Sequence, residues 1–323
     1  MSGVLGMITK VSAAVVSGAL LIQLVRFRQQ SRRLWALVLS GRKAVCVGKN
    51  YHEHITELAQ LGPEWKLDRE LEPVLFLKPT SSYARPGEPL MLPRQRLTSN
   101  ATEKHGVHHE VELAVIIGRK AKDITDDASA MACVAGYALA LDITQRDEQT
   151  AAKNKGMARR CRLLRQHSRR LCTCTPVAAT RALSHLSVIL CAQPWSVSKS
   201  YDSFLPLSEP FVLPPGADWR ALHMWLCVNG ERRQACDAGV MIHSVPALIR
   251  FVSQVMTLEP GDLLVTGTPK GVGPLVAGDR VTAGIDGYAT MEVEVVQQQA
   301  LESSSSTAFW WDMFDAFKRE LWI

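Results

Sequence analysis

The sequence predicts an α+β protein in which strands outnumber helices. Short runs of β-branched and other apolar residues recur along the chain, each bounded by Gly, Pro or polar residues, as is typical of strands. Between residues 41 and 297 three stretches have a helical pattern, and they do not alternate with strands as they would in a βαβ fold. With 323 residues, 47% of them hydrophobic, the chain can bury a sizeable core.

The elements follow one another in short steps. The first half is expected to hold strands at 44–48, 74–77, 110–117 and 137–141, and helices at 51–60 and 128–134. In the second half, 223–228 and 231–234 flank Asn229-Gly230, the residue pair that favours a tight hairpin turn. An amphipathic helix at 245–256, a strand at 263–265, a loop at 266–273 and strands at 280–284 and 290–296 complete this domain.

The first 40 residues differ in composition from the rest of the chain. They hold Lys10 and four arginines without any acidic residue, and their apolar run, 11–25, is shorter than the about 20 residues of a membrane-spanning helix. Basic, acid-free segments of this kind are typical of mitochondrial transit peptides. We therefore expect a targeting segment and a mitochondrial protein; a membrane anchor, a plastid address and a cytosolic location are the alternatives.

Charge and cysteine usage argue against two classes of protein. The net charge is +6, but residues 1–40 and 158–193 together hold twelve basic residues and no acid, so the remaining body is mildly acidic. A nucleic-acid-binding protein would gather its basic residues on one folded face, so we expect no nucleic acid as partner. The eight cysteines do not form a spaced disulfide framework, which favours a reducing compartment.

Two segments stand apart from the main domain. Residues 158–193 contain seven arginines and four cysteines, without the C-x-x-C spacing of a zinc site. Residues 298–323 read as a serine-rich linker and an aromatic amphipathic helix, which we expect to dock on its own fold rather than on a partner or a membrane. The expected boundaries are 1–40 for the targeting or anchor segment, 41–297 for the main domain with an insert at about 158–193, and 298–323 for the tail.

A pair of glutamates marks one end of the most apolar strand. Glu110 and Glu112 are two residues apart, so they share a strand face, and His108 continues the row. Neighbouring carboxylates repel each other, and burial increases the cost. A hard divalent cation such as Mg²⁺ or Mn²⁺ would relieve the repulsion, because it prefers carboxylate oxygen. The alternative is an exposed strand end with ordinary surface glutamates.

The helix expected at 51–60 carries an acid–base pair. His54 and Glu57 are three residues apart and share a helix face. A carboxylate beside an imidazole orients it and raises its basicity, so this pair could activate water. Taken alone, the spacing fits a fortuitous surface ion pair better.

The loop from Gly267 to Gly273 is rich in glycine but matches no nucleotide-binding motif. No Lys-Ser or Lys-Thr follows its last glycine, and Val276 stands where G-x-G-x-x-G requires glycine. Its small residues and backbone N–H groups suit a carboxylate or an enolate oxygen.

Seven stretches occur in one order along the chain: VGKNYHEHITEL, EPVLFLKPTSSY, HHEVELAVIIG, GYALALDITQRDEQ, PWSVSKSYD, LCVNGERRQ and LLVTGTPKGVGP. Together they resemble the fumarylacetoacetate hydrolase superfamily, and most closely its short mitochondrial acylpyruvase/oxaloacetate decarboxylase branch. The resemblance covers about residues 41–296 except 158–193. It implies a mixed β-sandwich roll with a lid helix, a homodimer and an Mg²⁺ or Mn²⁺ site.

The resemblance also implies roles for single residues. Metal ligands would be Glu110, Glu112 and Asp142; the catalytic residues would be His54, Glu57 and Lys199; and the substrate contacts would be Arg146, Gln149 and Thr268. The implied reactions are metal-dependent hydrolysis of acylpyruvates to pyruvate and a carboxylic acid, and decarboxylation or tautomerisation of oxaloacetate.

The insert departs from the family pattern, in which KGM would run almost directly into PWSVSK. Residues 158–193 are either a loop that leaves the fold at its surface, which costs little entropy, or the product of a translated intron or gene-model error. Two alternative functions therefore stay open: a hydrolase or isomerase of another 2-oxo diacid from aromatic degradation, and an inactive binding relative whose site the insert blocks. Membrane contact is expected only through the N-terminal segment.

Overall fold

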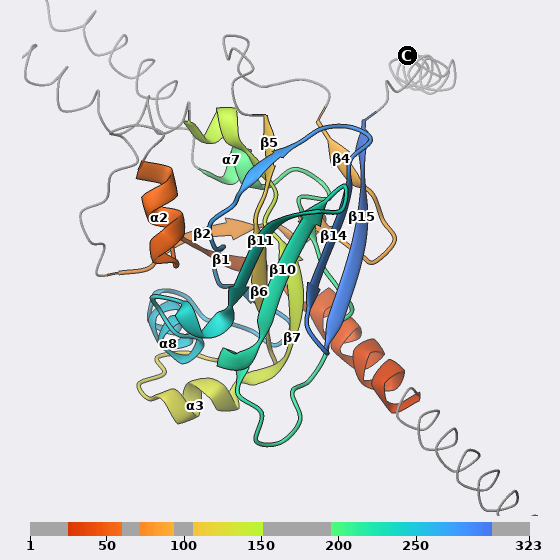
Figure 1. The fold of residues 1–323 in the computed structure, drawn as a ribbon. Coiled ribbons are helices and arrows are strands. Elements are labelled where there is room, and N and C mark those ends of the chain that lie inside the picture. Colours follow the sequence, from red (N-terminus) through yellow and green to blue (C-terminus); the bar gives the residue numbers. More distant parts are fainter. Residues whose placement is uncertain (1–24, 60–71, 94–105, 151–194, 299–323) are drawn as a thin grey trace, which may run out of the picture.

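The computed structural model describes residues 25–59, 72–93, 106–150 and 195–298 (Figure 1). Residues 11–24 of the apolar run, the insert at 158–193 and the tail from 299 onward lie outside the described residues. Within the described ranges, no helix combines the length and the apolar character needed to cross a membrane.

The first of two large sheets has the strand order β2-β1-β12-β6-β7. Its strands are β1 (Ala44–Gly48), β2 (Val74–Lys78), β6 (Val111–Ile117), β7 (Val134–Leu141) and β12 (Leu263–Val265). β1 and β12 are parallel, and the other neighbours are antiparallel. Every residue of β6 is buried, which explains why this strand is apolar almost throughout instead of alternating.

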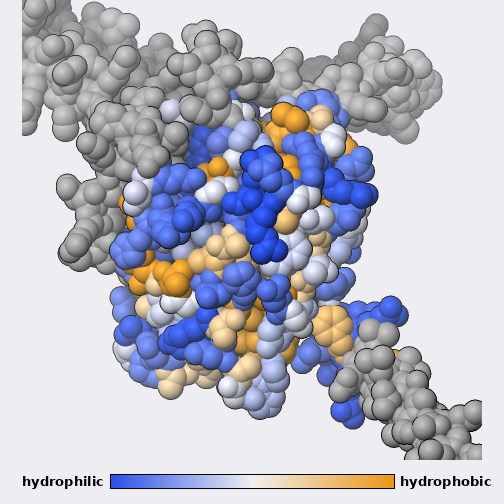
Figure 2. Space-filling model, in the orientation of Figure 1, coloured by the Kyte–Doolittle hydropathy of each residue, from blue (hydrophilic) through white to orange (hydrophobic). Residues whose placement is uncertain are grey.

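The second sheet has the order β11-β10-β14-β15-β4. Its strands are β4 (Leu90–Leu92), β10 (His223–Val228), β11 (Glu231–Asp237), β14 (Arg280–Ile285) and β15 (Ala289–Gln297). The predicted hairpin is confirmed: Asn229 and Gly230 join β10 to β11 with φ of 51° and 83°, the two positive values of a type I′ turn. β15 alternates buried and exposed residues, and the face of the molecule in Figure 2 is mainly hydrophilic with small apolar patches.

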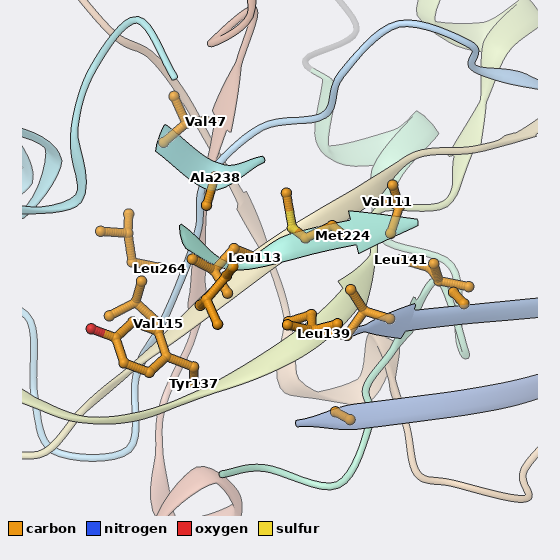
Figure 3. Packing of buried hydrophobic residues seen from close by; sticks show 14 of the residues in the cluster. Val47, Val111, Leu113, Val115, Tyr137, Leu139, Leu141, Met224, Ala238 and Leu264 are labelled. Carbon is orange, nitrogen blue, oxygen red and sulfur yellow. The ribbon is translucent and has the colours of Figure 1, made fainter. Parts of the chain in front are cut away.

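The main core lies between the two sheets (Figure 3). Val111, Leu113 and Val115 of β6 belong to one apolar cluster with Leu139 of β7 and Met224 of β10. These side chains are completely buried, and each contributes about 1.5–3 kcal/mol of transfer free energy. The core therefore fixes β6 and β7, the strands that border the site described below.

A second, smaller cluster covers the other face of the first sheet. It includes Ala114 of β6, Ala140 of β7, and Leu34 and Val38 from a helix that extends over residues 25–40. Gly136 lies against this helix and against β-bridge residue Phe211, since a Cβ there would lie 3.0 Å from Leu34 Cδ1 and 2.6 Å from the Phe211 carbonyl oxygen. The last part of the N-terminal 40 residues thus packs on the main domain.

The remaining elements are short. A three-stranded sheet has the order β13-β5-β8 and consists of β13 (Gly273–Leu275), β5 (Val107–His109) and β8 (Thr144–Gln145), and β3 (Tyr83–Ala84) pairs with β9 (Leu205–Pro206). Besides the helix over residues 25–40, the helices include α2 (His52–Ala59), α3 (Asp127–Ala132), α7 (Trp195–Lys199) and α8 (Val245–Val255), and residues 146–150 are also helical. The Asp126 and Ser244 side chains cap α3 and α8 by accepting hydrogen bonds from backbone N–H groups of the first turn.

Several expected boundaries differ from the structure, and three of the differences have an identifiable cause. The strand expected at 110–117 begins at Val111, because the Val111 N–H donates to the Gln234 side chain and Glu110 interrupts the ladder. The helix expected at 128–134 ends at Ala132, because β-branched Val134 starts β7. Gly273, expected in a loop, begins β13 and pairs with His109.

Candidate active site

Three carboxylates meet at one end of the first sheet. Glu110 and Glu112 border the start of β6, and Asp142 directly follows β7. Glu112 lies opposite Ala140 in the ladder, so Asp142 is two residues further along on the same face. One ligand oxygen from each residue lies within 4.8 Å of the others, and all three residues are buried. The structure therefore brings together the three ligands that the family resemblance implies.

Cationic side chains neutralise two of these carboxylates. Lys199, the last residue of α7, places Nζ 2.9 Å from Glu110 Oε2 and 2.5 Å from Asp142 Oδ2. Arg146 places Nη2 2.5 Å from Glu110 Oε1 and donates from Nη1 to Gln149 Oε1. Burial alone would raise the pKa of Glu110, but Lys199 and Arg146 outweigh it and hold that pKa below its usual range. Glu110 is therefore ionised.

Glu112 has a different environment. Its Oε2 accepts a hydrogen bond from the Gly267 N–H at 2.5 Å. Burial, followed by the charges of Asp142 and Glu110, raises the pKa of Glu112 well above its usual value. A bound cation would compete with the proton on this carboxyl. Among the three ligand candidates, Glu112 is therefore the one whose ionisation depends most on cation binding.

The donor set fits a hard divalent cation. Asp142 Oδ1 is buried and accepts no hydrogen bond from the described residues, although Lys78 Nζ lies 2.9 Å away at ion-pair distance. Buried polar atoms without a hydrogen bond are uncommon. Together with the oxygens of Glu110 and Glu112, this atom offers the carboxylate ligands that Mg²⁺ and Mn²⁺ prefer.

A pocket opens beside the carboxylates. Its cavity volume is about 20 Å³, which is room for about one water molecule or ion. Its walls include eight of the nine residues named from the sequence, namely His54, Glu110, Glu112, Asp142, Arg146, Gln149, Lys199 and Thr268, together with Val47, Gly48, Lys49, Phe76 and Trp195. The ninth residue, Glu57, does not line the pocket and contacts it through His54.

The His54–Glu57 pair forms as the sequence suggested. His54 Nδ1 lies 3.1 Å from Glu57 Oε2, and Glu57 also accepts a hydrogen bond from the Gly271 N–H. Burial alone would raise the pKa of Glu57, but the hydrogen bonds from His54 and Gly271 outweigh it and lower the pKa. An ionised Glu57 accepts from Nδ1–H, so Nε2 of this buried imidazole becomes the proton acceptor.

The glycine-rich loop binds carboxylates of the protein itself. Its N–H groups are expected to suit a carboxylate or an enolate oxygen, and two of them donate to the Glu112 and Glu57 carboxylates. Gly271 has a φ of 92°, and a Cβ there would lie 2.1 Å from the Arg233 carbonyl oxygen, so the turn requires glycine. The loop therefore connects a metal-ligand candidate to the acid–base pair.

Two buried polar residues were not assigned from the sequence. Gln234 of β11 accepts from the Val111 N–H and donates to Thr268 Oγ1, so it joins the start of β6 to the glycine-rich loop. Lys78 ends β2 and is completely buried. The sequence carries no clear signal for Gln234, because β11 does not alternate between buried and exposed residues. For Lys78 the signal is a charged residue that closes an apolar run.

Comparison with known proteins shows the family. Residues 43–183 and 171–296 match the family described as "Fumarylacetoacetate (FAA) hydrolase C-terminal". The chain belongs to this family. It is 38% identical to the Bos taurus protein "Oxaloacetate tautomerase FAHD1, mitochondrial" over 255 residues, which are 79% of this chain and 92% of that protein. It is also 38% identical to "Oxaloacetate decarboxylase, mitochondrial" of Dictyostelium discoideum over 259 residues, 80% of this chain and 95% of the relative.

Solved structures of family members share the fold. Fumarylpyruvate hydrolase from Pseudomonas aeruginosa, in complex with Mn²⁺ and pyruvate, is 29% identical with a TM-score of 0.58, covering 80% of this chain and 91% of that chain. An isomerase from Mycobacterium smegmatis, 5-carboxymethyl-2-hydroxymuconate delta-isomerase, is 30% identical with a TM-score of 0.56, covering 80% of each chain. The expected strand-rich α+β class is confirmed, and the mitochondrial names of the relatives agree with the localisation expected from the first 40 residues.

Proposed function

We propose that the protein is a divalent-cation-dependent mitochondrial enzyme that acts on short 2-oxo acids, with oxaloacetate as its main substrate and tautomerisation or decarboxylation as its reaction. The observation that carries the proposal is the convergence of three buried carboxylates beside Lys199 and Arg146 in one pocket. Relatives named oxaloacetate tautomerase and oxaloacetate decarboxylase support it.

The charge balance of the site favours a substrate with two carboxylates. Three cationic side chains, Lys78, Lys199 and Arg146, lie within 3 Å of Glu110 or Asp142, and Lys49 also lines the pocket. A divalent cation adds two positive charges, and uncompensated charge is costly in a buried site. Oxaloacetate carries two negative charges and would compensate more of this positive charge than an acylpyruvate with one carboxylate.

Different residues of the site have different roles in the proposed reactions. A cation held by Glu110, Glu112 and Asp142 would act as a Lewis acid that stabilises negative charge on the 2-oxo oxygen. Lys199 adds positive charge at the same place. In tautomerisation His54 Nε2 accepts a proton from C3, and the C–H electron pair forms the C2=C3 double bond. The π pair of the carbonyl moves to the 2-oxo oxygen, and a proton returned to that oxygen completes the enol. In decarboxylation the C3–C4 bond breaks and CO₂ leaves, its electron pair forms the C2=C3 double bond, and the carbonyl π pair moves to the same oxygen. The resulting enolate takes a proton from water to give pyruvate, so His54 is not required.

Acylpyruvate hydrolysis is the second candidate, and His54 on the pocket wall, paired with Glu57 outside it, favours this reaction. His54 would take a proton from a water molecule, which attacks the distal acyl carbonyl. The C–C bond then breaks to give the enolate of pyruvate and a carboxylic acid. A relative named fumarylpyruvate hydrolase, seen with Mn²⁺ and pyruvate, supports this reaction.

One assay series tests both reactions. Keto–enol exchange of oxaloacetate is followed by ultraviolet absorbance, and pyruvate release is measured from oxaloacetate and acetylpyruvate, each with and without Mg²⁺ or Mn²⁺. We expect Glu112→Ala to lose activity by more than about 100-fold, since it removes a ligand of the Lewis acid. Glu292→Ala is the matched control, because Glu292 belongs to an exposed E-x-E pair on β15. Full activity in Glu112→Ala would refute the metal assignment.

His54→Ala separates the reactions. We expect it to lose tautomerisation and hydrolysis but to keep most decarboxylation, because only the first two need a proton acceptor. An equal loss of all three would contradict the proposed division of roles.

Partners are also proposed on the family resemblance. We propose a homodimer, and we expect any membrane contact through the N-terminal segment alone. Sedimentation equilibrium tests the first, and a strictly monomeric, active enzyme would refute it.

A further inference from the structure

We propose that Lys78 is a positioning residue that holds the two halves of the active site together. It fixes the carboxylate of Asp142 and the end of the helix that carries Lys199. The proposal rests on the function proposed above, because it concerns the same site.

The contacts of Lys78 are unusual for a lysine. Its side chain is completely buried, and Nζ donates to the carbonyl oxygens of Ile143 at 2.9 Å, Lys199 at 2.6 Å and Phe204 at 2.7 Å. A lysine ammonium has three N–H donors, so the three carbonyls use all of them. Lys78 thereby links the residue after Asp142, the last residue of α7 and the residue before β9.

The same ammonium also forms an ion pair with Asp142 Oδ1 at 2.9 Å. Its positive charge lowers the electrostatic cost of the buried carboxylate, while its N–H groups also hold the three carbonyl oxygens. A ligand carboxylate whose position is fixed by such a partner favours cation binding.

Lys78 also joins the two edges of a sheet. β2 and β7 are the outermost strands of the order β2-β1-β12-β6-β7. Four steps between strands would separate them by about 19 Å in a flat sheet, far beyond the reach of a lysine and an aspartate. The first sheet must therefore curl, and the Lys78–Asp142 contact spans its concave side.

The linked residues lie on both sides of the insert. Asp142 and Ile143 precede residues 158–193, and Lys199 and Phe204 follow them. Lys78 is a direct connection between these two parts that does not depend on the chain between them. It therefore explains how Lys199 is placed beside Glu110 and Asp142 even though a long stretch of sequence separates them.

Mn²⁺ binding to the full-length protein, measured by electron paramagnetic resonance, tests the proposal. We expect Lys78→Met to weaken Mn²⁺ binding by about 10–100-fold and to lower kcat more than it raises KM, as loss of an outer-shell partner does. Lys43→Met is the matched control, since Lys43 precedes β1 and pairs with buried Asp262, outside the pocket. Its Mn²⁺ affinity should stay within about threefold of wild type, even where its melting temperature falls.

A Lys78→Met protein that is folded and binds Mn²⁺ as tightly as wild type would overturn the proposal. So would a loss of affinity no larger than that of Lys43→Met. Lys78→Gln keeps two N–H donors for the carbonyls and serves where Lys78→Met does not fold, with the same expected loss. Wild type that binds no Mn²⁺, or Glu112→Ala that binds it normally, would instead refute the proposed function, so the two failures are distinguishable.

Discussion

At the scale of single residues, two E-x-E pairs in the part of the chain that the structure describes have opposite environments. Glu110 and Glu112 are buried and converge with Asp142, whereas Glu292 and Glu294 on β15 are exposed and point into solvent. Strand alternation predicts the same arrangement for both pairs, since it places the two glutamates of each pair on one face of the strand. What differs is whether other parts of the fold cover that face. Burial increases the repulsion between neighbouring carboxylates, and a bound cation relieves it.

The His54–Glu57 contact leads to a prediction on acid stability. The pKa of Glu57 in the folded protein lies below its usual 4.5, so its ionised form stabilises the fold above about pH 4.5, and this stability is lost as the pH falls through the lowered value. Without added cation, we expect wild type to melt above Glu57→Gln at neutral pH and the difference to shrink below about pH 4.5. Differential scanning calorimetry across this range measures it.

Glu53→Gln is the control for this experiment. Glu53 belongs to the same helix but forms an exposed ion pair with Lys270. We expect its effect on the melting temperature to be smaller, since exposed pairs contribute little. If the difference in melting temperature between wild type and Glu57→Gln grows as the pH falls, the lowered pKa of Glu57 is contradicted.

At the scale of elements, buried polar side chains connect segments that the strand ladders leave separate. Gln234 is 1% exposed and bonds to Val111, His109, Thr268 and Pro269. It thereby ties β11 to the start of β6 and to the glycine-rich loop. Gln234 connects β11 of the second sheet with β6 of the first sheet and donates directly to Thr268. We therefore expect its replacement to change mainly the position of Thr268.

The helix over residues 25–40 gives a prediction on stability. Leu34 is 7% exposed and packs in the niche left by Gly136, whereas Leu39 on the same helix is 50% exposed. We expect Leu34→Ala to lower the free energy of unfolding by about 2–3 kcal/mol and Leu39→Ala by less than about 0.5 kcal/mol. Urea denaturation measures both. Equal effects would contradict the docking of this helix on the first sheet.

At the scale of the whole molecule, the site depends on segments that meet from both halves of the chain. Glu110, Glu112 and Asp142 come from the part before the insert, and Lys199 and Thr268 come from the part after it. The two sheets hold these parts in place through one shared core, and Lys78 connects them at the site. Chain continuity through residues 158–193 is therefore not what positions the catalytic groups.

Removal of the insert tests this conclusion. We expect a protein lacking residues 158–193 to keep its Mn²⁺ affinity and oxaloacetate turnover within about threefold, and to gain at most about 1 kcal/mol of stability, because loop-closure entropy grows slowly with length. Loss of Mn²⁺ binding on deletion would show that the insert builds part of the site. Peptide mass mapping of native protein adds an independent check: a peptide that joins Met157 directly to Pro194 would show that the inserted form is not the one made.

The sequence by itself determined the fold class, the Asn-Gly hairpin and the family, because these follow from local periodicity, turn chemistry and ordered motifs. It also named the residues that the structure gathers at the pocket, although their roles rest on the family resemblance. Only the tertiary structure decided that Glu110 interrupts the strand, that the loop amides bind the protein's own carboxylates, and that Lys78 reaches Asp142 across a curled sheet. Those features depend on contacts between residues far apart in the chain, and a local pattern carries no information about sheet curvature or about which buried charges meet.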